Sequence, residues 1–162
     1  MQSQEQTAQK TTLIIGGQRE FTCFRMNAFD ANILLLRLKK VFLPILGSLI
    51  GSDKGKAALD MDVKEAASAI AEHIDESVVQ GIVLPMLDKS RTYCTDLKSF
   101  VNSETAINKC FTTENLHEFY ELIFLVGRYQ FGPFLEKMIA QFGDRIAEKL
   151  NEQTSPESSA NS

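Results

Sequence analysis

Helical periodicity dominates the pattern of hydrophobic and polar positions along the chain. In residues 28–49 many apolar side chains recur at about 100° per residue, which predicts a long helix with one face in the core. Asn27 is placed to cap its first turn, and Asp30 suits the positive end of its dipole. The predicted core face consists of Leu34, Leu35, Leu38, Val41, Phe42, Ile45, Leu46 and Leu49.

Further helical patterns follow later in the chain. One begins at Asp62, which has the spacing of a capping box with Glu65, and its apolar positions continue to Leu87. Gly81 and Pro85 are expected to bend or break this helix.

The carboxyl-terminal third predicts two helices. Thr113 can cap the first, and Gly132-Pro133 is expected to separate it from the second, because proline suits a helix's first position.

Strand patterns are short and lie near the amino terminus. Residues 12–15 and 20–25 have strand composition, and Gly16-Gly17 between them supplies the positive φ of a tight turn. Residues 92–95 could add a short strand beside this hairpin. We therefore predict an α+β, predominantly helical fold, with a short N-terminal β-hairpin followed by a helical bundle.

The length of 162 residues corresponds to one domain. We expect a single globular domain over residues 12–150, with disordered polar tails at 1–11 and 151–162. The net charge of -4 argues against a general nucleic-acid-binding protein.

The stretch 29–50 is long enough to span a membrane, but Arg37, Lys39 and Lys40 lie in its middle. Each would cost about 2.5–3.5 kcal/mol there, so we expect a helix of a soluble protein and no membrane partner.

Residues that could carry chemistry are sparse. The chain has no glycine-rich phosphate loop, and His73 and His117 are far apart without metal-ligand spacing. Cys23, Cys94 and Cys110 form no CxxC motif and are expected to be reduced, packed thiols. We therefore predict no catalytic, metal or cofactor site and no enzymatic activity. The enzymatic alternative is a nucleophile pair of Cys94 or Cys110 with His117, because such pairs meet in space.

The helix predicted over residues 28–49 has more apolar residues than one core face requires. A helix that is apolar nearly all round is either buried on every side or contacts a partner, and both alternatives are open here. The candidate partner-binding residues outside the core face are Ile33, Leu36, Leu43 and Ile50. Tyr129, Phe131 and Phe134 form a second candidate patch that could equally be core.

Three motifs occur in a distinctive order. They are the strand pair around Ile15-Gly16-Gly17 and Phe21-Thr22-Cys23-Phe24, the leucine-rich helix 31–49 with its basic middle, and the aromatic–glycine–aromatic segment 128–134. This layout, over residues 12–140, resembles the tail assembly chaperones of long-tailed bacteriophages.

The resemblance implies a chaperone that binds the tape-measure protein, keeps it soluble and promotes tail-tube polymerisation around it. It also implies action in the host cell cytoplasm and absence from the mature virion. Tail tube protein is a further implied partner, which many such phages recruit through a frameshifted extension of the chaperone. The polar tail from Asn151 would suit a flexible joint to such an extension. The alternative is a structural or adaptor subunit that uses the same apolar helix as a permanent oligomer interface, including a homo-oligomer.

Overall fold

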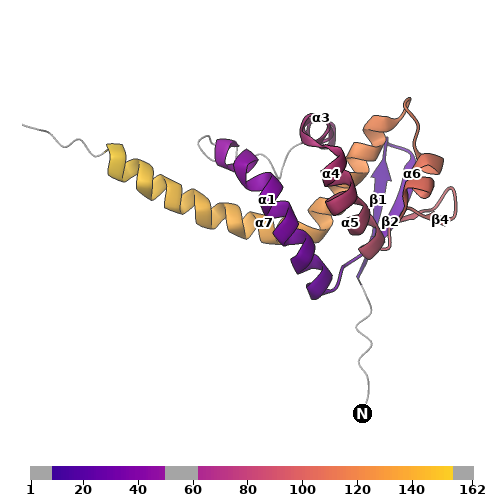
Figure 1. The fold of residues 1–162 in the computed structure, drawn as a ribbon, viewed down its shortest axis with the longest axis horizontal. Helices are drawn as coiled ribbons and strands as arrows, with labels where there is room; N and C mark the ends of the chain where they lie inside the picture. Colours follow the sequence, from indigo (N-terminus) through magenta and orange to yellow (C-terminus); the bar gives the residue numbers. More distant parts are fainter. Residues whose placement is uncertain (1–8, 50–61, 155–162) are drawn as a thin grey trace, which may run out of the picture.

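The structure is a computed structural model that describes residues 9–49 and 62–154 (Figure 1). Side chains are described for residues 9–40, 62–134, 136, 137, 140 and 141. The strands are β1 (Lys10–Ile15), β2 (Arg19–Phe24), β3 (Tyr93–Cys94) and β4 (Ser99–Phe100). The helices are α1 (Ala28–Leu49), α3 (Val63–His73), α4 (Glu76–Val78), the π-helical turn η1 (Val79–Val83), α5 (Leu84–Lys89), α6 (Glu104–Cys110) and α7 (Leu116–Thr154).

The predicted α+β class with an N-terminal hairpin is confirmed. The four strands form one antiparallel sheet in the order β1-β2-β3-β4. Tyr93 pairs with Thr22, so the strand expected near residues 92–95 does lie beside the hairpin. Gly16 and Gly17 have φ values of 60° and 77°, and the Gln18 N–H donates to the Ile15 carbonyl (3.3 Å) to close the turn.

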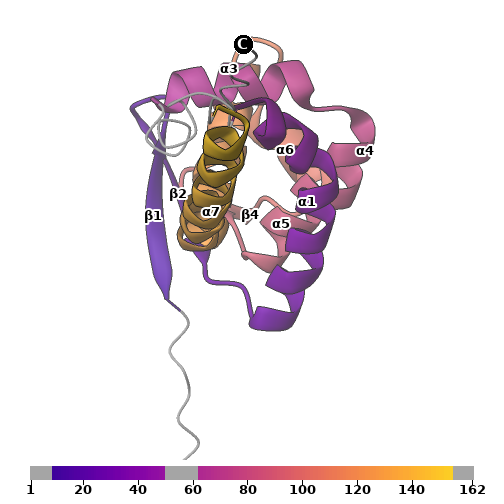
Figure 2. The ribbon, with the colours of Figure 1, turned by 90° about the vertical axis from the view of Figure 1, so that its left-hand side faces the viewer.

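The long helix α7 is the central element of the fold. Figure 2 shows it between β1 on one side and α1 and α5 on the other, with α3 crossing above. Its Leu122 and Val126 are completely buried against residues of the sheet and of α5, including Phe21 and Leu87. Phe111 stacks on Phe21 and packs near Phe119 of α7, so an aromatic cluster joins the sheet to this helix.

Polar side chains of α7 hold the hairpin at its turn. The buried Glu121 accepts a hydrogen bond from the Gly16 N–H (3.0 Å), and Glu118 forms an ion pair with Arg19 (2.9 Å). A buried carboxylate is stabilised when it accepts hydrogen bonds, and these contacts fix how the turn sits on the helix.

Gln130 of α7 holds the link between β2 and α1. Its side-chain amide donates to the Phe24 carbonyl (2.6 Å) and to Ser90 Oγ (3.1 Å), and its oxygen accepts from the Met26 N–H (3.0 Å). The start of α1 is then set by Asn27, whose side-chain oxygen accepts from the Asp30 N–H (2.9 Å). The predicted Asn27 cap is therefore confirmed.

The helix predicted from Asp62 to Leu87 is not continuous. Helix α3 ends at His73, because Ile74 is extended and Asp75 starts a new turn by accepting from the Val78 N–H (2.8 Å). Gly81 and Pro85 do not break the path, since η1 continues directly into α5. The predicted capping box is also wrong, because Asp62 makes no side-chain capping bond.

The predicted break at Gly132-Pro133 is wrong, since α7 runs through Pro133. A proline inside a helix costs about 3 kcal/mol, and here packing on both sides of it holds the helical path. Gln130 and the buried Phe131 anchor the preceding turn, while Lys39 of α1 lies over the Phe134 ring. Helix α7 also starts at Leu116, so Thr113 is not its cap.

Helix α6 was not predicted. Ser103 caps it by accepting from the Ala106 N–H (3.2 Å), and Glu104 lies in its first turn. This pair of residues is the local signal that could have indicated the helix.

Candidate partner-binding surface

Helix α1 lies at the periphery of the described fold and has one covered side. It contacts η1 and α5, and Leu34 is buried with only 2% of its surface exposed. Ala31, Leu35 and Leu38 pack around the same core. Over residues 28–40, whose side chains are described, one side of α1 is therefore not covered by other described residues.

The opposite side of α1 presents apolar side chains to solvent. Phe29 is 74% exposed and Leu36 is 53% exposed, the two highest values among the exposed large hydrophobic residues in the described part of the chain. Ile33 lies between them and is half-buried. The spacings of four and three residues place all three on one side of the helix. We call Phe29, Ile33 and Leu36 the outer stripe of α1.

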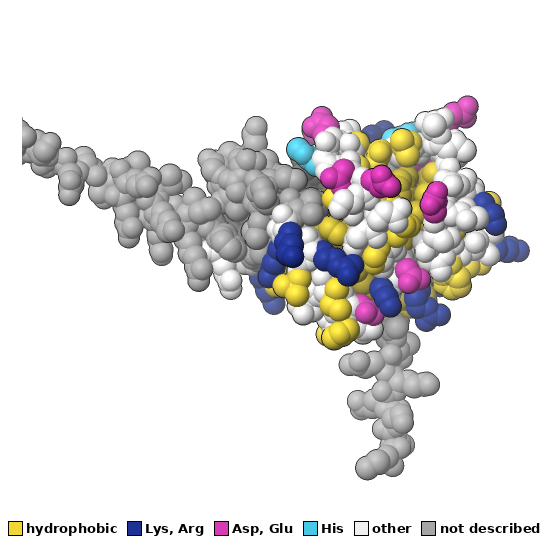
Figure 3. All heavy atoms as spheres, in the orientation of Figure 1, with side chains coloured by type: hydrophobic (Ala, Val, Ile, Leu, Met, Phe, Trp, Pro, Cys, Tyr) yellow, Lys and Arg dark blue, Asp and Glu magenta, His cyan; other side chains and the backbone are white. Residues whose placement is uncertain are grey.

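Basic side chains surround the outer stripe. Arg37 donates from Nη1 to the Gly81 carbonyl (2.9 Å), and Lys39 Nζ lies 5.5 Å from the centre of the Phe134 ring. Lys40 is exposed. Figure 3 shows Lys and Arg side chains interspersed with hydrophobic ones over α1, whereas several Asp and Glu side chains gather over α3 and α4. The surface of α1 is thus locally basic on a chain with a net charge of -4.

The structure places two of the four predicted site residues. Leu36 is exposed and Ile33 is half-buried, on the same side of α1. The side chain of Leu43 and the whole of Ile50 lie outside the described residues. The sequence reasoning missed Phe29, which extending the stripe back by four residues from Ile33 would have included.

The second candidate patch is largely structural. Phe131 is buried, and Tyr129 is held between the Gln9 carbonyl, to which its hydroxyl donates (3.2 Å), and Arg25, whose guanidinium carbon lies 3.8 Å from the ring centre. Only Phe134 is exposed, next to Lys39 at the edge of α1.

The thiols do not have the environment of nucleophiles. Cys23, Cys94 and Cys110 are all buried and form no disulfide. Burial raises the pKa of Cys23 to about 11, against the opposing effect of Arg25. Burial, reinforced by the neighbouring Cys94 thiol, likewise raises the pKa of Cys110 to about 11. A reactive cysteine needs a lowered pKa and access to solvent, so these observations oppose the alternative of a Cys–His nucleophile pair.

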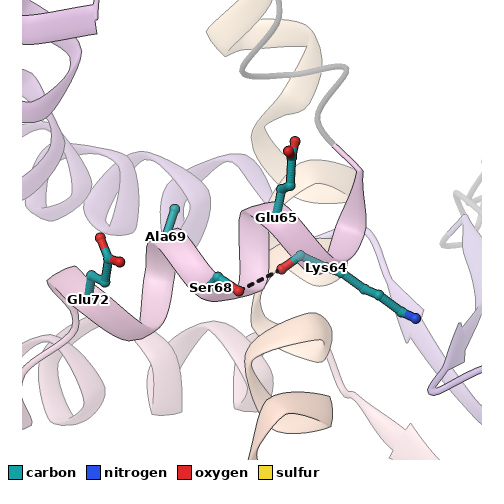
Figure 4. A pocket seen from close by; sticks show the side chains of 5 residues that line it. All are labelled: Lys64, Glu65, Ser68, Ala69 and Glu72. Carbon is teal, nitrogen blue, oxygen red and sulfur yellow. Dashed lines mark hydrogen bonds between the residues drawn. The ribbon is translucent and has the colours of Figure 1, made fainter.

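The surface depression along α3 does not bring its polar side chains together either. Figure 4 shows one along α3, lined by Lys64, Glu65, Ser68, Ala69 and Glu72. The carboxylates point outward and Lys64 extends away from them. The Ser68 hydroxyl donates a hydrogen bond to the Lys64 carbonyl within the helix (3.0 Å). Among the described residues, His, Cys, Asp and Glu form no cluster of three or more that could hold a metal ion. No described helix combines the length and apolar character needed to cross a membrane.

Comparison with known protein families decides the family. The family model described as phage tail assembly chaperone protein, TAC, matches residues 16–143. The chain belongs to the phage tail assembly chaperone family. The matched region of this chaperone begins at the hairpin turn, after β1, and ends within α7, so it includes β2, β3 and β4, α1 and the aromatic segment of α7. The resemblance noted from the sequence is confirmed.

Membership of a chaperone family implies a non-enzymatic role in tail assembly through binding of tail proteins. No curated protein and no solved structure matches the chain.

Proposed function

We propose that this tail assembly chaperone binds the tape-measure protein of its phage, keeps it soluble and promotes polymerisation of the tail tube around it. The observation that carries the proposal is the outer stripe of α1, an exposed apolar surface in a protein of this family. The protein would act in the cytoplasm of the host cell and leave before the virion is complete. Tail tube protein would be a second partner, met when the tube grows along the coated client.

The outer stripe suits reversible binding of a long client. Full burial of a side chain such as Leu or Phe contributes about 1.5–3 kcal/mol, so Phe29 and Leu36 offer a modest gain at each site. Part of that gain offsets the loss of rotational and translational freedom on association. Many weak contacts along one client reinforce one another through effective concentration, while each copy can still dissociate.

The test is co-expression with the tape-measure protein, measured as the soluble fraction of the client and the amount that co-purifies. The variant Phe29→Asp/Leu36→Asp should lose both, because each carboxylate would have to be desolvated in the interface. The matched control is Leu97→Asp/Leu116→Asp, which changes one exposed leucine between β3 and β4 and another at the start of α7, and should retain the client.

Circular dichroism of both variants checks that they fold, as expected for substitutions at exposed positions. If the unmodified protein neither solubilises nor co-purifies with the tape-measure protein, the proposal is wrong. If the protein is present in purified virions at a fixed stoichiometry, the alternative of a permanent structural subunit replaces it.

A further inference from the structure

The outer stripe of α1 follows the spacing of a coiled-coil seam. Phe29, Ile33 and Leu36 alternate at four and three residues, which is the spacing of successive d and a positions in a heptad repeat. In the sequence the same register continues to Lys40 and Leu43. The remaining side of the helix is occupied, because Leu34 and Leu38 pack on the protein's own core. A second helix laid along the stripe would meet only seam residues and their flanks.

The flanking positions beside Leu36 are basic, whereas Asp30 falls at the e position beside Phe29. With Ile33 at an a position, Arg37 falls at e and Lys39 at g, one on each side of the stripe, and Lys40 falls at the next a. In the described part of the chain none of these three cations forms an ion pair, and the only one observed joins Arg19 to Glu118.

Asp30 is the one acidic residue in the sequence of α1, and it lies in the first turn of the helix. The carboxylate of Asp30 accepts a hydrogen bond from the side-chain amide of Asn27 (2.8 Å), within the capping turn of α1. Asp30 lies one heptad before Arg37, and in the described part of the chain no ion pair joins it to Arg37, Lys39 or Lys40.

The geometry points to a partner helix with an apolar heptad stripe and acidic side chains on both flanks. The assignment of this partner helix to the tape-measure protein rests on the function proposed above. Residues at e and g set the choice of partner in coiled coils, because opposite charges attract across the seam and like charges repel. Like-charge repulsion disfavours parallel pairing of α1 with α1 of a second copy, because Lys40 at the seam of one copy would face Lys40 of the other. The face thus selects an acidic helix from a client and resists self-association.

The first experiment uses synthetic probe helices with the full-length protein. One labelled peptide of several heptads has leucine at a and d and glutamate at e and g, and the matched peptide has lysine at e and g. Fluorescence anisotropy should show binding of the glutamate peptide, weakening in about 1 M salt, where the Debye length is about 3 Å. The lysine peptide should bind at least about tenfold more weakly at low salt. Equal binding of the two peptides would overturn the inference.

Charge reversal tests the residues. Lys39→Glu/Lys40→Glu should weaken binding of the glutamate peptide by about tenfold or more and strengthen binding of the lysine peptide. The control Lys64→Glu/Lys109→Glu lowers the net charge of the chain equally, at exposed positions on α3 and α6, and should leave both affinities unchanged. If the first variant does not fold, Arg37→Gln provides the same test, with a smaller expected loss of affinity for the glutamate peptide. Equal effects of the reversal and its control would mean that only net charge matters.

Other occupants of the face are distinguished by separate measurements. A dimer in sedimentation velocity that Leu36→Asp abolishes would assign the stripe to a second copy of the chain. Binding of a short DNA duplex that survives Leu36→Asp and disappears in Lys39→Glu/Lys40→Glu would assign the basic residues to nucleic acid. Either result would overturn the inference.

The outcomes also separate this inference from the proposed function. If the tape-measure protein co-purifies and is lost on Phe29→Asp/Leu36→Asp but not on charge reversal, the proposed function stands and the acidic-helix inference fails. If the glutamate peptide binds but the tape-measure protein does not, the charge selectivity of the face stands and its client must be another acidic helix.

Discussion

The turn between β1 and β2 contains two adjacent glycines that should respond differently to the same substitution. Gly16 and Gly17 have φ values of 60° and 77°, so alanine at either position is forced into a left-handed conformation. That conformation costs a residue with a Cβ about 1–2 kcal/mol. At Gly17 a Cβ would meet nothing within 4 Å, so Gly17→Ala should lower the free energy of unfolding by about this amount alone.

Gly16→Ala should cost more, because the new methyl group would collide with α7. A Cβ there would lie 2.5 Å from Glu118 Oε1 and 2.9 Å from its carboxyl carbon. Movement of the Glu118 carboxylate away from the methyl group would strain or break its pairing with Arg19, which is made through Oε2 at 2.9 Å. Loss of a pair that is still partly solvated costs about 1 kcal/mol. The expected total for Gly16→Ala is therefore about 2–3 kcal/mol.

Urea unfolding followed by circular dichroism measures both values by linear extrapolation. The same pair of substitutions in a Glu118→Ala background completes a double-mutant cycle. There the cost of Gly16→Ala should fall to that of Gly17→Ala, because the colliding carboxylate is gone. The reasoning is refuted if the two glycine variants are equally destabilised in the natural background, or if Glu118→Ala leaves their difference unchanged.

Three further predictions concern buried groups. The three thiols should react with a thiol reagent at neutral pH only after unfolding, and fast reaction of Cys94 or Cys110 in the folded protein would restore the thiol-enzyme alternative. Because folding raises the pKa of Cys23 and Cys110 from 9.0 to about 11, their protonated forms are favoured in the folded state. Their contribution to stability should be fully present below pH 9.0 and should decline as the pH rises to about 11. Urea unfolding should show a smaller decline for Cys23→Ala than for the unmodified protein. Thr92→Val should leave the free energy of unfolding unchanged or raise it by about 1 kcal/mol, since the buried Thr92 hydroxyl has no hydrogen-bond partner among the described residues. A loss of stability in urea unfolding would show that this hydroxyl is hydrogen-bonded in solution.

Local chemistry determined the elements that could be predicted from the sequence. The hairpin turn follows from Gly16-Gly17, since glycine readily adopts positive φ at both positions. The start of α1 follows from Asn27, whose side chain bonds to the Asp30 N–H within the same turn. Each of these features depends on residues within a few positions along the chain, so the local sequence is sufficient to indicate it.

Contacts between distant residues decided where the helices end. Pro133 is a local signal for a break, yet α7 continues because Gln130 and Phe131 are anchored to the rest of the fold. The end of α3 at His73, by contrast, has a local signal, because Asp75 caps the next turn. A propensity of a few kcal/mol is overridden when packing of comparable size opposes it.

The candidate binding surface shows the same division. The sequence alone determined the order of side chains around the axis of α1, so Ile33 and Leu36 could be placed together and opposite Leu34. Only the tertiary structure decided which side is covered, because burial depends on where η1, α5 and α7 lie. Phe29 is the clearest case. Its place on the stripe follows from its spacing to Ile33 in the sequence, whereas its exposure depends on the absence of a described neighbour that covers it.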